Sequence, residues 1–159
     1  MNAPTAHQRC PQKMEYEEEI ALQEIIESSQ AGAAIVSPDG QWLRINAYLC
    51  EMLGYEEDEL LAMTFQEVTH PEDLAHERPY LERLTSGGID HYRFRKRYIH
   101  KAGHVVWGLL DRSVVRDAER KPLYFISRIR DITEEKNAEP PPTLVSKFKS
   151  RLQGLLQRR

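Results

Sequence analysis

Hydrophobic positions near the N-terminus recur with helical spacing. Over residues 14–31, an apolar stripe that includes Leu22, Ile25 and Ile26 lies behind a run of glutamates, and acidic residues stabilise the start of a helix. The pattern predicts an amphipathic helix over 14–31 that pairs with a second copy of itself through these three residues. Residues 1–13 are polar and are expected to form a disordered tail.

Apolar and polar residues alternate, as in strands, both before and after a helical middle. A Pro-Asp-Gly turn joins the first two of these segments. The five predicted strands cover residues 33–36, 42–45, 91–99, 105–115 and 123–130. Hairpins on either side of a helical middle are typical of an α+β fold, with an antiparallel sheet covered by helices on one face.

Helix-boundary residues divide the middle of the chain into three predicted helices. Asn46 and Gly54 bracket a short first helix, as expected of an N-cap and a C-cap. A second short helix is expected over 56–63. Pro71 suits the first turn of a third helix, which runs to about Leu84.

Composition limits the possible classes of protein. The 159 residues are 40% hydrophobic and carry a net charge of −3, which suits one domain with tails and gives no sign of nucleic-acid binding. The sequence contains no apolar run of about 20 residues that would cross a bilayer and no secretory signal. The two cysteines, Cys10 and Cys50, do not suggest a disulfide framework, so the expected compartment is a reducing cytoplasm.

Motifs of catalysis and metal binding are missing from the sequence. There is no Gly-rich phosphate loop and no Gly-x-Ser-x-Gly element. No Cys/His group has the spacing of a structural zinc site. The sequence therefore predicts a protein that is not an enzyme and holds no metal.

Seven short motifs follow one another in a fixed order over residues 20–139. Together they resemble the PAS family, in the subgroup with a PAC-type C-terminal half. The motifs are Ser37–Gly40, Asn46, Met52–Tyr55 with Glu59–Leu60, His70–Asp73, Lys96–Ile99 before Gly103, Val114–Asp117, and Asp131–Thr133.

The resemblance implies a PAS/PAC domain over residues 32–139, with a five-stranded antiparallel sheet and helices on one face. It also implies a non-enzymatic sensory module of signal transduction, beside a signalling partner such as a histidine kinase or a cyclase. We expect this module to act through homodimerisation and protein–protein interaction. The alternative is a sensor of a small ligand or of haem.

Apolar residues expected on the helical side of the sheet are the candidates for a ligand pocket. They are Ile35, Leu53, Leu74, Leu81, Phe94, Trp107 and Phe125. The same residues equally suit a packed core without a ligand, and we expect that simpler arrangement.

Cofactor binding has one candidate residue in the long helix. Some haem-binding relatives place an axial histidine there, which makes His76 the residue to test, although an exposed histidine is more common. Light-sensing relatives need a reactive cysteine in the segment that reads Thr64–Glu67 here, and this segment contains none. We therefore expect no cofactor, with haem as the alternative and flavin unexpected.

The last predicted strand continues directly into a charged helix without an intervening Gly or Pro. Asp131 and Thr133 lie at this junction, and both residue types cap helices. Capping alone explains their presence. The resemblance adds a role in signal transmission, because a shift of the strand would move the helix.

The C-terminal 140–159 segment combines a proline spacer with a basic amphipathic pattern. Residues 140–142 are prolines, and five basic residues accompany an apolar stripe beyond them. This pattern suits docking on a partner or on the chain's own acidic surface. Peripheral contact with an anionic membrane or a nucleic acid is the alternative for the segment.

Overall fold

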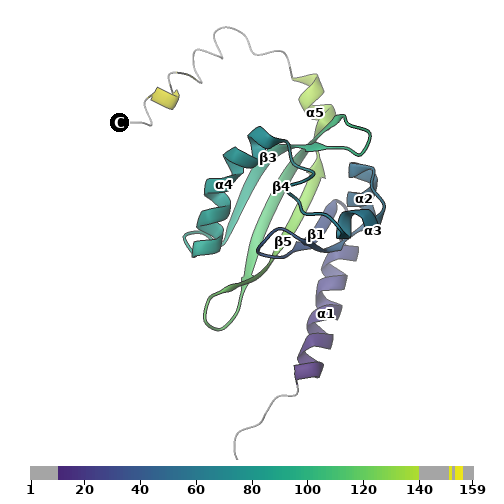
Figure 1. The fold of residues 1–159 in the computed structure, drawn as a ribbon, viewed down its shortest axis with the longest axis vertical. Coiled ribbons are helices and arrows are strands. Elements are labelled where there is room, and N and C mark those ends of the chain that lie inside the picture. Colours follow the sequence, from purple (N-terminus) through teal and green to yellow (C-terminus); the bar gives the residue numbers. More distant parts are fainter. Residues whose placement is uncertain (1–10, 140–150, 152, 156–159) are drawn as a thin grey trace, which may run out of the picture.

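One five-stranded antiparallel sheet forms the centre of the protein (Figure 1). The computed structural model describes residues 11–139, 151 and 153–155. The strands lie in the order β2-β1-β5-β4-β3. Their bounds are β1 Gly32–Val36, β2 Trp42–Ile45, β3 His91–Ile99, β4 Val105–Arg116 and β5 Pro122–Asp131. The predicted α+β fold class and the chain order of the strands are confirmed.

Helices cover both faces of the sheet, but unequally. The three helices of the middle segment pack on one face, and α1 packs against β1 on the other face (Figure 1). α5 follows β5 directly. The helices are α1 Pro11–Glu27, α2 Ala47–Leu53, α3 Glu57–Leu61, α4 Pro71–Ser86 and α5 Thr133–Ala138.

The bounds of α1 differ from those predicted. The helix begins at Pro11 rather than at residue 14 and ends at Glu27 rather than at 31. Proline is well tolerated in the first turn of a helix, where its missing N–H has no intrahelical acceptor. Residues 1–10 of the predicted tail lie outside the described residues. So does most of 140–159, of whose apolar stripe only the exposed Leu155 is described.

Asn46 ties three elements together. Its side chain accepts hydrogen bonds from the backbone N–H of Leu49 in α2, at 3.1 Å, and of Ala33 in β1, at 3.0 Å. Its amide nitrogen donates to the carbonyl oxygens of Ile26 and Ala31. The predicted N-cap is thus confirmed, and it also fixes the end of α1 to the sheet.

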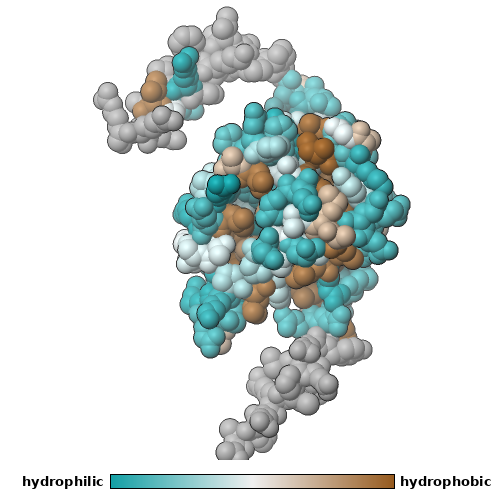
Figure 2. Space-filling view, in the orientation of Figure 1, coloured by the Kyte–Doolittle hydropathy of each residue, from teal (hydrophilic) through white to brown (hydrophobic). Residues whose placement is uncertain are grey.

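The main core lies between the sheet and the helices α2, α3 and α4. Fully buried residues from every strand and every covering helix contribute to it, among them Trp42, Leu49, Phe65, Leu84 and Phe125. Hydrophilic residues dominate the outer surface on the face shown in Figure 2, with hydrophobic residues visible between them. Within the described residues, no helix has both the length and the apolar character needed to span a membrane.

A second, smaller core lies on the opposite face of the sheet. Ile26 of α1 packs there against Ala33 and Ile35, with Leu22 and Ile126 at its margin. Neighbouring residues of a strand point to opposite faces, so β1 is buried on both sides. Ile35 therefore does not face the helical side, and its expected place in a pocket there is wrong.

Gly108 of β4 makes room for a ring on the neighbouring strand. A Cβ atom at this position would lie 2.4 Å from Cε2 of Tyr98 and 3.1 Å from Cγ2 of Ile129. Both neighbours are fully buried, so they have little room to move.

We expect Gly108→Ala to lower the free energy of unfolding by about 1–3 kcal/mol, because overpacking a tight core forces side chains out of their preferred positions. Gly88→Ala is the matched control, since a Cβ there meets nothing closer than 3.5 Å. Urea unfolding of both variants measures the difference. Equal stability of the two variants would contradict the close packing of Tyr98 on β4.

Candidate functional site

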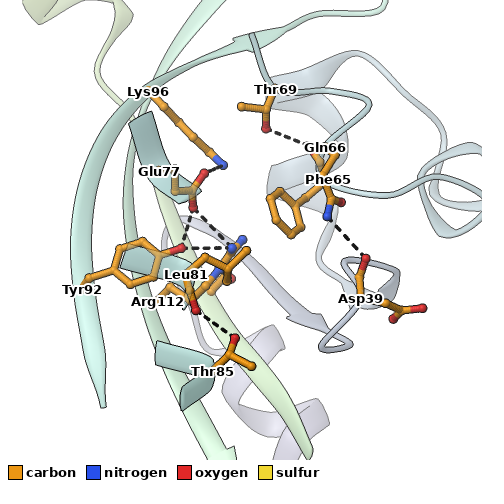
Figure 3. A network of polar contacts seen from close by, with 11 residues as sticks. Asp39, Phe65, Gln66, Thr69, Glu77, Leu81, Thr85, Tyr92, Lys96 and Arg112 are labelled. Atoms are coloured by element: carbon orange, nitrogen blue, oxygen red, sulfur yellow. Dashed lines mark hydrogen bonds and ion pairs between the residues drawn. The ribbon is translucent and has the colours of Figure 1, made fainter. Parts of the chain in front are cut away.

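A buried polar cluster lies between α4 and the sheet (Figure 3). The Glu77 carboxylate accepts hydrogen bonds from Nζ of Lys96 at 2.7 Å, from the hydroxyl of Tyr92 at 2.6 Å and from Nη1 of Arg112 at 3.3 Å. Arg112 also donates from Nε to the hydroxyl of Ser127, at 3.0 Å. Glu77, Lys96 and Arg112 are each at most 1% exposed. We call these five residues the interior cluster.

Strand register brings the members of the interior cluster together. Arg112 of β4 pairs with Tyr92 of β3 on one side and with Ser127 of β5 on the other. Lys96 lies four residues beyond Tyr92 in the same strand, so it points to the same face. Glu77 reaches this face from α4, and its single carboxylate bonds two strands.

The interior cluster holds two cations for one carboxylate, which determines how its groups titrate. Desolvation opposes ionisation of Glu77, but the nearby Lys96 and Arg112 outweigh it and hold its pKa below the ordinary value. Desolvation dominates at Lys96 and lowers its pKa from 10.5 to about 8, despite the attraction of Glu77. Burial also raises the pKa of the Tyr92 hydroxyl.

The two cations of the interior cluster also lie over aromatic rings. The Arg112 guanidinium lies 4.3 Å from the ring centroid of Phe65, and the Lys96 ammonium lies 5.0 Å from the same centroid and 4.9 Å from that of Tyr98. Such contacts stabilise a cation most where water is excluded.

A hollow of about 160 Å³ adjoins the interior cluster. Its walls come from α4 and from the segment before it, and they are mostly apolar. The lining residues are Phe65, Gln66, Leu74, Glu77, Arg78 and Leu81. Surface depressions of 430–450 Å³ also occur, between α2 and α3 and beside α1, and Ser127 is the one member of the interior cluster in their described linings.

Of the seven predicted pocket residues, two line the hollow, three belong to the main core, and two face the other side of the sheet. Leu74 and Leu81 line the hollow. Leu53, Phe94 and Phe125 lie in or against the main core on the same side of the sheet.

The seventh pocket candidate, Trp107, lies on the opposite face of β4, with its ring near Arg97 and Lys136. Its expected place on the helical side is therefore wrong, as it is for Ile35. The inward positions of this strand are Val106, Gly108, Leu110 and Arg112.

Haem does not fit the geometry of the interior. His76 is an exposed residue of α4 and is not among the residues that line the hollow. The side chains of Glu77, Lys96 and Arg112 are buried between α4 and the sheet. Among the residues that the structure describes, His76 therefore lies on the surface of α4 and not at the hollow.

At the junction after β5, side-chain and backbone bonds join α5 to β4. The backbone N–H of Trp107 donates to Oγ1 of Thr133 at 3.0 Å, and the Trp107 carbonyl accepts from the N–H of Ile132 at 2.9 Å. Asp131 accepts from the N–H of Thr133 at 2.9 Å. The N-cap position belongs to Ile132, which makes no side-chain cap. Thr133 thus anchors the helix to the sheet, and Asp131 bonds the first residue of the helix.

A second set of contacts, missed in the sequence, joins α4 to α5 around the edge of the sheet. Asp73 of α4 accepts from both the backbone and the guanidinium of Arg97, at 2.6–3.0 Å. The Arg97 guanidinium lies 5.7 Å from the ring centroid of Trp107, and Nζ of Lys136 lies 4.9 Å from it. These bonds from Arg97 lower the pKa of Asp73 even though burial opposes the change.

The family model described as PAS fold matches residues 42–129, which is more than half of the chain. The chain therefore belongs to the PAS family, as its motifs had suggested, and it is a sensory module of signal transduction. Its hollow and interior cluster both lie within the matched residues.

Curated relatives resemble the chain over most of its length. The probable diguanylate cyclase DgcE of Escherichia coli strain K12 is 44% identical over 131 residues, which cover 82% of the chain and 12% of that protein. The sensor histidine kinase TmoS of Ectopseudomonas mendocina is 26% identical over 115 residues, covering 72% of the chain and 12% of that protein. The chain thus spans only a small part of either relative.

Solved structures support the fold. A PAS domain from Colwellia psychrerythraea superposes with a TM-score of 0.64 at 15% identity, covering 75% of the chain and 98% of that domain. A LOV protein from Rhodobacter sphaeroides gives a TM-score of 0.66 at 16% identity, covering 78% of the chain and 72% of that protein. At these identities the likeness is one of fold alone.

We expect the stability of the protein relative to Lys96→Met to rise with pH between about 8 and 10.5. Below pH 8 the lysine is charged in both the folded and the unfolded state, and the cost of burying it is fully present. Above pH 8 the folded state loses this proton before the unfolded state does, so the cost falls, by about 1 kcal/mol for each pH unit.

Urea unfolding of both proteins at pH 7.5 and pH 9.5 measures this change. Lys96→Met keeps the pair of Glu77 with Arg112. The difference between the two proteins at each pH therefore removes the contribution of the other titrating groups. A difference in stability that stays constant between the two pH values would contradict a buried, charged Lys96.

Proposed function

We propose that this PAS module senses a small molecule in the hollow beside Glu77 and transmits the change to α5. The hollow and the interior cluster support the input, since buried polar groups next to a small apolar hollow are typical of ligand sites. The bonds of Trp107 with Ile132 and Thr133 support the output. Both relatives carry such a segment within a cyclase or a histidine kinase, so we propose an output partner of one of these two classes.

The observation that carries this proposal is the pair of hydrogen bonds between the Trp107 backbone and the start of α5. Because its N–H and its C=O both bind the junction, α5 cannot shift against β4 without breaking hydrogen bonds. Arg97 stacks near the same tryptophan and is held by Asp73 of α4. A movement of α4 would therefore reach α5 through two contacts.

We expect Asp73→Asn and Thr133→Val to have non-additive effects on the stability of α5. If Arg97 and Trp107 couple the two helices, the double variant will differ from the sum of the single variants by at least about 0.5 kcal/mol. Hydrogen exchange of the backbone amides of residues 133–138 gives the local opening free energy in all four proteins.

Glu135→Gln paired with Asp73→Asn provides the matched control. Glu135 lies in α5 and pairs with Arg130, and this pair is about half exposed, whereas the cations over the Trp107 ring are Arg97 and Lys136. We expect its cycle with Asp73 to be additive. Additive behaviour in both cycles would overturn the proposed route.

We also propose that a second copy of the chain docks on α1. Leu22 and Ile26, which the sequence had assigned to the dimer, pack on the chain's own sheet. Ile20 and Ile25 are instead 42% and 45% exposed, and part of α1 projects beyond the sheet (Figure 1). Ile25 and Arg128 line a groove of about 450 Å³ beside the helix. Its apolar residues and the single cation Arg128 suit the acidic α1 of another copy.

We expect the joint change Ile20→Glu and Ile25→Glu to convert a dimer to a monomer, because it places charges in an apolar contact. Sedimentation equilibrium measures the effect. Leu43→Glu is the matched control, since Leu43 of β2 is 47% exposed and is not among the residues that line this groove. If the unchanged protein sediments as a monomer at all concentrations, or if Leu43→Glu is equally disruptive, this docking surface is wrong.

A further inference from the structure

We infer that the hollow beside Glu77 binds a small monocarboxylate with an apolar body, whose carboxylate is recognised by Lys96 and Arg112. The inference rests on the proposed sensing function and adds the chemical class of the ligand. Three observations carry it. They are the charge balance of the interior cluster, its unused hydrogen-bond donors, and the size and walls of the hollow.

The interior cluster has an excess of positive charge. Lys96 and Arg112 are buried with the single carboxylate of Glu77, and both form ion pairs with it, at 2.7 Å and 3.3 Å. A buried charge is costly unless it is paired. A second carboxylate would balance the cluster, a neutral ligand would leave the imbalance unchanged, and a cation would increase it.

Hydrogen-bond donors of the interior cluster exceed the acceptors available. Lys96 has three donors on Nζ, and within the described residues only Glu77 accepts from it. Arg112 uses Nε and Nη1, but no described residue accepts from Nη2. The buried hydroxyl of Tyr98 also has no partner among the described residues. A ligand that only accepts hydrogen bonds, as a carboxylate does, complements this set.

The hollow fits a molecule about the size of a benzene ring. Its volume is about 160 Å³, and an apolar cavity of about 150 Å³ is known to admit benzene. Phe65, Leu74 and Leu81 supply apolar walls, and Gln66, Glu77 and Arg78 are the polar residues of the lining. Lys96 and Arg112 are not part of this lining, but both contact Phe65 and pair with Glu77, two residues that are part of it. A carboxylate at the Glu77 end of the hollow would therefore approach the two cations.

Binding of this kind would act on α4. The ligand's carboxylate competes with Glu77 for the same two cations, so Glu77 is weakened as the link between α4 and the sheet. Asp73 lies one helical turn before Glu77 and holds Arg97. Weaker bonds from Glu77 would therefore alter the contact through which α4 reaches Trp107 and α5.

The test compares each of two carboxylates with its neutral amide of the same shape. Benzoate is paired with benzamide, and isobutyrate with isobutyramide, in titration calorimetry on the full chain at constant ionic strength. We expect at least one carboxylate to bind about tenfold more tightly than its amide, since hydrogen bonds to charged groups are the stronger ones. Line broadening or shifts of the Leu74 and Leu81 methyl signals in NMR locate the binding.

Lys96→Met is the matched variant. It has a similar shape and leaves Glu77 paired with Arg112 alone, so we expect it to remove the preference for the carboxylate. The comparison within the unchanged protein needs no variant and decides the question even if Lys96→Met fails to fold. Equal affinity of carboxylate and amide, or no binding of either carboxylate, overturns the inference.

The two levels of the proposal fail separately. If the carboxylates do not bind but the coupling of Asp73 with Thr133 is found, the ligand class is wrong and the transmission route stands. If a carboxylate binds at Leu74 and Leu81 but leaves hydrogen exchange of α5 unchanged, the ligand class is correct and the proposed sensing function is wrong.

Discussion

The carboxylate of Glu77 is the group on which the arrangement of α4 and the sheet depends. It bonds Tyr92 and Lys96 of β3 and Arg112 of β4 from a single position on the helix. Without it, two cations would remain buried and unpaired, which costs far more than a surface charge does. The helix that borders the hollow is thus held by an electrostatic contact rather than by apolar packing alone, and such a contact is sensitive to any new charge in the hollow.

Much of the fold could be predicted because local signals agreed with the tertiary structure. The cap at Asn46, the left-handed Gly54 and the strand alternation of residues 91–99 all occur as expected. β1 was harder to interpret, since all five of its residues are buried. A strand covered on both faces loses the alternation that would reveal its orientation, and Ile35 was therefore placed on the wrong side.

The candidate site was less visible in the sequence. Lys96 shares the strand parity of Tyr92 and Tyr98, so alternation alone could have placed it inside. Its partner could not be found in this way, because only the packing of α4 on the sheet brings Glu77 near it. Trp107 is expected on the helical side of the sheet, but its ring lies on the opposite face, near Arg97 and Lys136.

β3 connects the two faces of the sheet. Lys96 points into the interior and bonds Glu77, while the next residue, Arg97, contacts Trp107 on the opposite face. Consecutive residues of a strand share one backbone, so a displacement of one side chain that moves the strand must move the other. α4 forms ion pairs with both residues, with Lys96 through Glu77 and with Arg97 through Asp73. In the proposed route, an interior change at Glu77 would thus reach α5 through a stretch of two residues rather than through the whole sheet.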